Sequence, residues 1–328
     1  MKFKCCNNIL HTLNFQHVGL MACGFTYWGD YYGEIFSLEA YKEKRDEIVN
    51  ALKNGNIPEI CQTCGILSET EWDESIGFSC VEITNRPKCS ICNCIYCIAT
   101  GADDEVKQYR NNYEPYDIKP VLLNLRENNA LLPNCKFAIN GGEVAEYPKE
   151  ELKWLIYLAI KQNSPISILS SGIKYSKEIE HALRFLDTQI QISVDAGKPK
   201  TYEKIKRVKG CFNKVWNNLK NYIKASENDK RFPYKVIIKF IVIPGINDNI
   251  EEIKAFISKC RSINCKCIVF SIEINYKKNH YDTTVSGHLL DSIKYIVECR
   301  KNNPDIEFRF APEAEEWFNN QRRWNRLY

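Results

Sequence analysis

Residues 81–100 read VEITNRPKCSICNCIYCIAT, and four of the nine residues from 89 to 97 are cysteines. A short apolar and β-branched run precedes them, so we expect a strand that ends just before a cysteine-rich loop. Cysteines this close together cannot all form disulfides without strain. Soft thiolates on one loop suit a bound metal ion or an iron–sulfur cluster better. The stretch therefore predicts a metal or cluster site.

The spacing of the cysteines allows two alternative sets of three ligands on this loop. The spacing C-x4-C-x2-C uses Cys89, Cys94 and Cys97, and the tighter C-x-C-x2-C uses Cys92 in place of Cys89. The C-x-aromatic-C ending resembles the cluster loop of the radical S-adenosylmethionine (SAM) superfamily, whose usual form is C-x3-C-x-aromatic-C. Ser90 occupies the usual first position, and a one-residue insertion that moves the first ligand to Cys89 is the simplest explanation of this departure. Three thiolates leave the fourth iron open for SAM, just as catalytic metal sites keep an open position.

Strand-like and helical segments alternate after the cysteine loop. We expect strands at 80–84, 136–140, 166–170, 190–195, 236–243 and 267–274. We expect helices at 120–131, 148–162, 176–186, 212–224 and 250–260. Such alternation predicts an α/β fold with a parallel sheet, and the resemblance implies a partial (β/α)6 TIM-like barrel.

The chain is expected to divide into three parts. A cysteine-rich module occupies 1–78, the barrel covers 79–311, and a helix forms the C-terminal segment 312–328. A seventh strand is expected near 306–310, and the polar loop 275–284 is a candidate substrate lid. Ligands of parallel sheets bind at the carboxyl ends of the strands.

Polar residues fall at those carboxyl ends. Gly141, Gly142 and Glu143 follow the second strand and resemble the family's G-G-E motif, whose backbone meets the amino group of SAM. The glutamate offers an acceptor for an ammonium group. Ser193 and Asp195 share one face of the fourth strand, because side chains alternate along a strand. They resemble a family S-x-D pattern near the ribose and carboxylate of SAM.

Lys239 is the single lysine within the apolar run 236–243, and a charge in such a run needs a counter-ion. The resemblance implies that this lysine pairs with the SAM carboxylate. Ile243 shares its face and is expected to wall the adenine, near which Tyr96 should also pack. Cys267 is expected deep in the barrel, where a thiol could return a hydrogen atom to a substrate radical. A buried structural cysteine is the commoner alternative.

A second group of cysteines precedes the barrel. Cys61 and Cys64 form a C-x2-C knuckle, and Cys6 and Cys23 would complete four soft ligands, with Cys5 as an alternative to Cys6. A closed four-thiolate site can hold zinc or a second [4Fe–4S] cluster. The segment resembles the auxiliary-cluster (SPASM or twitch) modules of radical SAM enzymes. Those modules usually follow the barrel, whereas this one precedes it.

Composition excludes several classes. A net charge of +4 over 328 residues gives no strong case for polyanion binding. The expected helix 312–328 is basic and aromatic, and we expect it to dock on the barrel rather than to bind nucleic acid. We find no run of 18 apolar residues and no signal-like apolar core near residue 1. Sixteen cysteines without such signals favour metal ligands in a reducing cytoplasm.

The resemblance implies an enzyme that cleaves SAM at a reduced [4Fe–4S] cluster and removes a substrate hydrogen atom through a 5′-deoxyadenosyl radical. It also implies a one-electron donor such as flavodoxin or ferredoxin. The reaction would be oxidoreductase-like or epimerase-like, on a peptide, a sugar or a small metabolite. A competing interpretation is a non-catalytic zinc or iron–sulfur binding module, with RNA as a candidate partner. That alternative explains the cysteines but not the polar ends of six strands.

Overall fold

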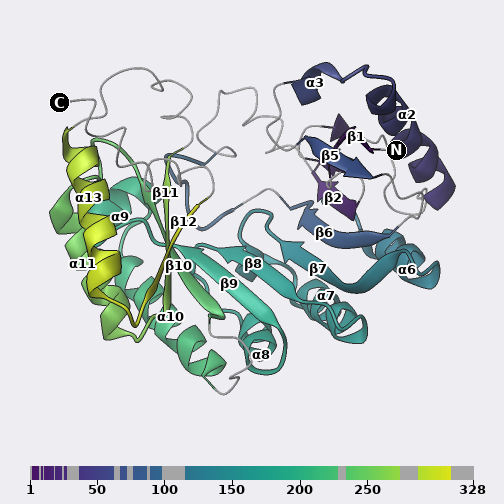
Figure 1. The fold of residues 1–328 in the computed structure, drawn as a ribbon. Coiled ribbons are helices and arrows are strands. Elements are labelled where there is room, and N and C mark those ends of the chain that lie inside the picture. Colours follow the sequence, from purple (N-terminus) through teal and green to yellow (C-terminus); the bar gives the residue numbers. More distant parts are fainter. Residues whose placement is uncertain are drawn as a thin grey trace. The chain divides into compact units, whose positions relative to one another are not determined.

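The computed structural model describes residues 2–6, 9, 11–17, 19–23, 26–27, 37–62, 67–71, 77–86, 89–97, 115–227, 234–273 and 287–311. The chain divides into two compact units. The first contains Met1–Lys88, Tyr109–Gly142 and Lys153–Ser167, and the second contains Cys89–Gln108, Glu143–Leu152 and Ile168–Tyr328. Two of the boundaries between the units fall within helix α7 (Lys149–Lys161) and strand β8 (Ile166–Ser170), which are labelled in Figure 1.

The first unit is built on a mixed sheet in the strand order β7-β6-β2-β3-β4. Its strands are β2 (Thr12–Gln16), β3 (Gly19–Cys23), β4 (Thr26–Tyr27), β6 (Phe78–Thr84) and β7 (Leu131–Ile139). β2, β6 and β7 run parallel, whereas β3 and β4 are antiparallel additions. A separate antiparallel pair is formed by β1 (Lys2–Cys5) and β5 (Ser68–Glu71). The helices are α2 (Leu38–Lys53), α3 (Glu59–Gln62) and α6 (Lys119–Glu127).

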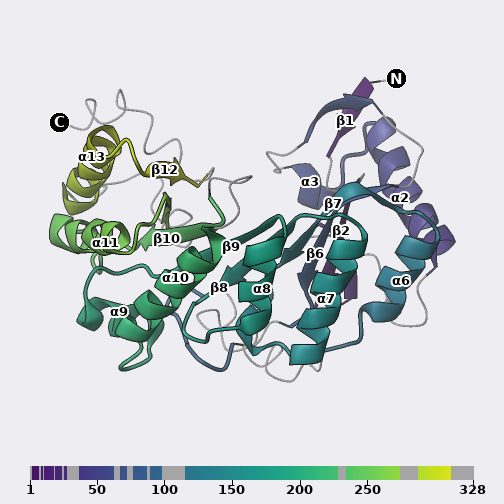
Figure 2. The ribbon, with the colours of Figure 1, turned by 90° about the horizontal axis from the view of Figure 1, so that it is seen from below.

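The second unit carries the strand order β8-β9-β10-β11-β12, and β9 to β12 run parallel. These strands are β9 (Thr188–Ser193), β10 (Val236–Val242), β11 (Cys267–Ile272) and β12 (Glu307–Phe310). The helical segments are η2 (Val144–Glu146), α8 (Lys177–Phe185), α9 (Pro199–Lys206), α10 (Phe212–Ser226), α11 (Ile250–Ser262) and α13 (Gly287–Asn302). Strands and helices thus alternate along the chain (Figure 2).

One face of the second unit's strands is apolar and packs on helices. Phe240 of β10 contacts Phe256 of α11 at a ring-centroid distance of 4.8 Å, and Phe270 of β11 joins the same aromatic cluster. The opposite face differs, because Ser193 and Lys239 lie on it as partners in the β9–β10 register. Burial of the aromatic face stabilises the second unit. The opposite face carries polar side chains, among them Ser193 and Lys239.

The predicted α/β fold with alternating strands and helices is confirmed. β4 and β12 each have a single sheet neighbour among the described strands, so the sheet does not close into a full barrel. The expected helix 120–131 instead ends at Glu127, because Asn129 adopts a left-handed conformation (φ +54°) before β7 begins. The described helices include none with the length and hydropathy that a bilayer crossing requires.

The expected three-part division stays a prediction. β2, from the expected cysteine-rich module, pairs in parallel with β6, which begins at the expected boundary. The candidate lid 275–284, the C-terminal helix 312–328 and Cys64 lie outside the described residues.

Candidate active site at the cysteine loop

The cysteine loop is fastened to the end of helix α9. The amide of Asn93 donates to the carbonyl of Lys206 at 3.0 Å, and the amide of Ile95 donates to the carbonyl of Ile205 at 3.0 Å. Carbonyl groups in the last turn of a helix have no partner within the helix, and α9 ends here because Arg207 turns left-handed (φ +52°). The loop supplies the missing donors, so Cys94 is held on both sides.

Three thiols of the loop lie in contact. The sulfur of Cys92 is 3.4 Å from that of Cys89 and 3.7 Å from that of Cys94. Cys97 closes a turn, its amide donating to the carbonyl of Cys94 at 3.1 Å. No three Cys, His, Asp or Glu side chains within the described ranges surround one point as metal ligands. The thiols must therefore turn toward any group that they bind.

The loop favours thiolates at two of its cysteines. Hydrogen bonding with Cys92 lowers the pKa of the Cys94 thiol to about 6, and the positive charge of Lys206 also lowers it, against the opposing effect of burial. The same type of hydrogen bond with Cys92 lowers the pKa of Cys89. The pKa of Cys92 is raised in turn by its bonds to Cys89 and Cys94. Thiolates are the form of cysteine that ligates metals.

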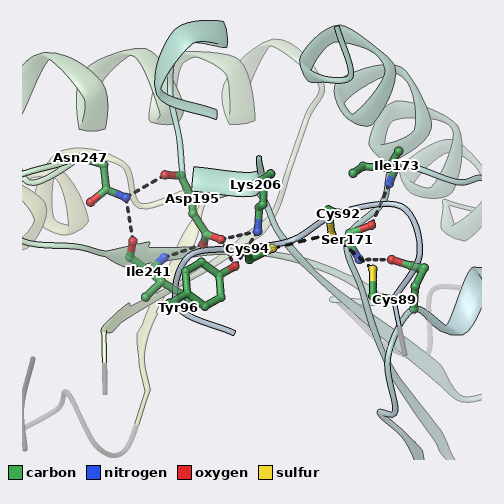
Figure 3. Close-up of polar contacts among 11 residues, drawn as sticks. Cys89, Cys92, Cys94, Tyr96, Ser171, Ile173, Asp195, Lys206, Ile241 and Asn247 are labelled. Atoms are coloured by element: carbon green, nitrogen blue, oxygen red, sulfur yellow. Dashed lines mark hydrogen bonds and ion pairs between the residues drawn. The ribbon is translucent and has the colours of Figure 1, made fainter. Parts of the chain in front are cut away.

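A buried polar cluster lies beside this loop (Figure 3). The Lys206 ammonium lies 2.6 Å from Oδ2 of Asp195, and both side chains are almost fully buried. The hydroxyl of Tyr96 donates to the same carboxylate oxygen at 2.5 Å and accepts from Lys206 at 2.6 Å. The three residues thus satisfy one another's hydrogen bonds.

The other groups of Asp195 are also occupied. Its Oδ1 accepts from the amide of Ile241 at 2.7 Å, and its backbone carbonyl accepts from the side chain of Asn247 at 2.8 Å. Asn247 also donates to the carbonyl of Ile241 and accepts from the amide of Ile243. Asp195 adopts a left-handed backbone (φ +61°), which aspartate tolerates better than most residues. Asp195 therefore joins the ends of β9 and β10.

Glu143 is likewise enclosed by protein donors. Its carboxylate is 1% exposed and accepts from the hydroxyl of Ser170 at 2.6 Å and from the amides of Ser171 at 2.7 Å and Ala145 at 3.1 Å. This geometry caps η2 and the end of β8. Gly142, just before it, needs its left-handed φ of +52°.

Replacing Glu143 by glutamine is expected to destabilise the protein by about 1–3 kcal/mol, because an amide nitrogen would then face the Ser171 amide with no acceptor. Urea unfolding checks this value. The matched control is Glu127→Gln, which changes an exposed glutamate of α6 and should leave stability unchanged within about 0.5 kcal/mol. An E143Q protein of unchanged stability but weakened SAM binding would instead place this carboxylate on the ligand.

Lys239 and Ser193 differ from these occupied groups. Both side chains are half-buried, and neither has a hydrogen bond or ion pair within the part of the chain that the structure describes. They are register partners on adjacent strands, so they point to the same side of the sheet. A half-buried ammonium without a counter-ion is costly unless a ligand supplies the charge.

Cys267 lies elsewhere on that face. Its side chain is fully buried in an apolar cluster with Ile237, Val269 and Ala311, and Tyr234 packs against the cluster. Burial raises the pKa of its thiol to about 12. Its surroundings are those of a packed core cysteine.

Three of the N-terminal thiols lie near one another in the first unit. Cys5, Cys6 and Cys61 are buried, and burial, with smaller effects of Cys6 and Cys61, raises the pKa of the Cys5 thiol to about 11. Cys23 ends β3, and its side chain is not among those described.

Three residues around the site are missing from the sequence predictions: Lys206, Asn247 and Glu252. Lys206 is one of several lysines in 198–206, and only its spacing of four from the buried Tyr202 marks it as inward-facing. Asn247 lies two residues before Asn249, the N-cap of α11. The Glu252 carboxylate holds the start of α9.

A family model described as the radical SAM superfamily matches residues 87–257 of the chain. This match covers more than half of the sequence, and the chain belongs to the radical SAM superfamily. No curated protein matches the sequence.

Solved structures share the fold. SuiB from Streptococcus suis bound to precursor peptide SuiA is 12% identical, with a TM-score of 0.51 over 95% of this chain and 73% of that one. SuiB bound to S-adenosylmethionine is 14% identical, with a TM-score of 0.50 over 85% of this chain and 57% of that one. anSMEcpe with bound AdoMet and Cp18Cys peptide is 16% identical, with a TM-score of 0.50 over 70% and 62%. In the last two cases this chain spans less than two thirds of its relative.

The family implies a [4Fe–4S] cluster and SAM, and the residues present fit both. Four thiols lie on one loop, two of them with lowered pKa values. The Lys239 ammonium and the Ser193 hydroxyl, which have no partner among the described residues, lie on neighbouring strands of the same unit.

Proposed function

We propose that this protein cleaves SAM reductively and uses the resulting radical to remove a hydrogen atom from a substrate. The observation that carries this proposal is the cysteine loop, which is fixed on α9 with its thiols gathered. Lys239 and Ser193, without partners in the described part of the chain, support it, because they suit the charged and polar groups of SAM.

Cys89, Cys94 and Cys97 are the proposed cluster ligands, with Cys92 as the alternative to Cys89. When bound, the cluster supplies the electron that breaks a carbon–sulfur bond of SAM, which gives a 5′-deoxyadenosyl radical. The protein's own part is to position three thiolates and leave the fourth coordination position open. The lowered pKa values of Cys89 and Cys94 favour ligation at neutral pH.

The proposed SAM contacts use the side chains that have no hydrogen-bond partner among the described residues. Lys239 would pair with the carboxylate, and Ser193 would donate to a neighbouring oxygen. Gly141 and Gly142 keep their predicted contact with the amino group through the backbone. Tyr96 and Ile243 remain the proposed walls of the adenine pocket.

Asp195 and Glu143 are better suited to hold backbone segments than to contact SAM directly. Each carboxylate already accepts three or more hydrogen bonds from the protein. We therefore propose that these two residues fix the strand ends on which the SAM contacts lie.

Replacing Lys239 by methionine is expected to weaken SAM binding about tenfold to a hundredfold, because a hydrogen bond to a charged group contributes about 1.5–3 kcal/mol. Calorimetry with the cluster-loaded protein measures the dissociation constant. Stability should not fall, since Lys239 has no protein partner to lose within the described residues. Lys200→Met, which changes an exposed lysine of α9, is the matched control. Equal SAM affinity in both variants would remove Lys239 from the site.

The substrate is proposed to be a peptide, with a sugar or a small metabolite as alternatives. Support comes from SuiB and anSMEcpe, whose structures contain a peptide. An oxidoreductase-like or epimerase-like reaction is proposed, with flavodoxin or ferredoxin as electron donor in a reducing cytoplasm. The buried surroundings of Cys267 favour the structural alternative over hydrogen-atom donation.

A second, auxiliary cluster is proposed on Cys6, Cys23, Cys61 and Cys64, with zinc and Cys5 as alternatives. The proximity of Cys5, Cys6 and Cys61 supports a thiolate site in the first unit. Anaerobic iron and sulfide analysis tests it: about four irons per protein indicate one cluster and about eight indicate two.

The competing function is a non-catalytic zinc or iron–sulfur binding module, with RNA as candidate partner. It predicts no SAM cleavage by a protein whose metal sites are full. It also leaves the half-buried ammonium of Lys239 without a role. Assaying 5′-deoxyadenosine from the reduced protein separates the two functions.

A further inference from the structure

A buried ion pair beside the cysteine loop has no part in the SAM contacts proposed above. Lys206 and Asp195 have side-chain exposures of 1% and 0%, and their charged groups are 2.6 Å apart. Lysine is almost never fully buried unless it is paired. Removing two charges from water is costly, and a hydrophobic pair of similar volume often gives equal or greater stability. Stability alone therefore does not explain this pair.

The pair joins segments that are distant in the sequence. Lys206 contacts Tyr96, which lies 110 residues before it on the cysteine loop. Its ammonium also lies 5.1 Å from the centroid of the Tyr96 ring. Asp195, at the end of β9, bonds to Tyr96 and to the amide of Ile241 on β10. One ion pair thus connects the loop, the end of α9 and two strand ends (Figure 3).

Helix α9 is itself fixed at its other end. The buried carboxylate of Glu252 on α11 accepts from the amides of Gly197 at 2.9 Å and Lys198 at 3.2 Å and from the hydroxyl of Thr201 at 2.6 Å. A Cβ on Gly197 would come within 2.2 Å of the Glu252 carbonyl oxygen, so the close approach requires glycine. α9 therefore forms a rigid support whose last residue is Lys206.

We propose that Lys206 is a positioning residue, which with Asp195 and Tyr96 clamps the loop segment 93–97 onto α9. The main-chain bonds of Asn93 and Ile95 to the end of α9 lie on either side of Cys94. The hydrogen bonds of the Tyr96 hydroxyl to Asp195 and Lys206 hold the tyrosine side chain, two residues after Cys94. Together they set where the Cys94 sulfur lies.

The test is hydrogen exchange of the peptide covering residues 89–97, measured on the full chain under anaerobic conditions without SAM. Lys206→Met should speed its protected amides at least tenfold. Lys204→Met, an exposed lysine on the same helix, should leave them unchanged. Because Lys206→Met leaves the Asp195 carboxylate buried and unpaired, the neutral double variant D195N/K206M is measured beside it. Rates within twofold of the wild type in both Lys206 variants would overturn the clamp.

The exchange measurement does not use SAM cleavage, so the clamp can fail or hold independently of the proposed function.

Discussion

Replacing Cys94 by alanine should remove about four bound irons per protein, because either ligand set then keeps only two of its three thiolates and these cannot hold a [4Fe–4S] cluster. SAM cleavage should fall at least a thousandfold with it. Cys94 is common to both ligand sets that the spacing allows. It is also held on both sides by α9. Anaerobic iron analysis and the visible absorption of the reconstituted protein measure the loss.

The remaining cysteines of the loop decide between the two ligand sets. If Cys89 is the first ligand, Cys89→Ala should lose the cluster and Cys92→Ala should retain it, and the reverse holds for the tighter spacing. Cys211→Ala changes a half-exposed cysteine at the start of α10 and is the matched control. Wild-type iron content in the Cys94→Ala protein would contradict the site.

Replacing Asp195 by asparagine is expected to lower the free energy of unfolding by about 3–5 kcal/mol, because it leaves the buried charge of Lys206 without its partner. The Tyr96 hydroxyl also loses its charged acceptor. Urea unfolding of the full chain, with iron content matched between proteins, measures the change. Asp291→Asn on α13 changes an exposed carboxylate and is the matched control.

The double variant D195N/K206M completes a mutant cycle. Removing both charges should restore part of the lost stability, since neither charge is then left unpaired. A coupling energy near zero between the two positions would contradict a direct ion pair. Equal destabilisation by Asp195→Asn and by its control would contradict the burial of the pair.

The sequence was sufficient for much of the fold, because its apolar residues alternate regularly. Ile190 and Ile192 face the core of the second unit and Ser193 the other side, as the period of two requires. The strand expected at 166–170 is β8, with the same bounds. The strands before residue 30 were not predicted, although Leu13 and Phe15 alternate with polar residues in β2.

The contacts of the site could not be predicted in the same way. The partners of Asp195 come from residues 96, 206, 241 and 247, and nothing in local spacing indicates that these residues meet. The sequence indicated correctly that Asp195 and Glu143 lie at strand ends, but not that protein donors surround their carboxylates. For Lys239 the sequence indicated a lysine in need of a counter-ion, and the structure shows it without one among the described residues.

The most direct test is the amount of 5′-deoxyadenosine that the anaerobically reconstituted, dithionite-reduced protein forms from SAM. We expect at least one equivalent per cluster from the wild-type protein and none from Cys94→Ala. A wild-type protein that holds its full complement of iron and sulfide yet forms no 5′-deoxyadenosine would contradict the proposal.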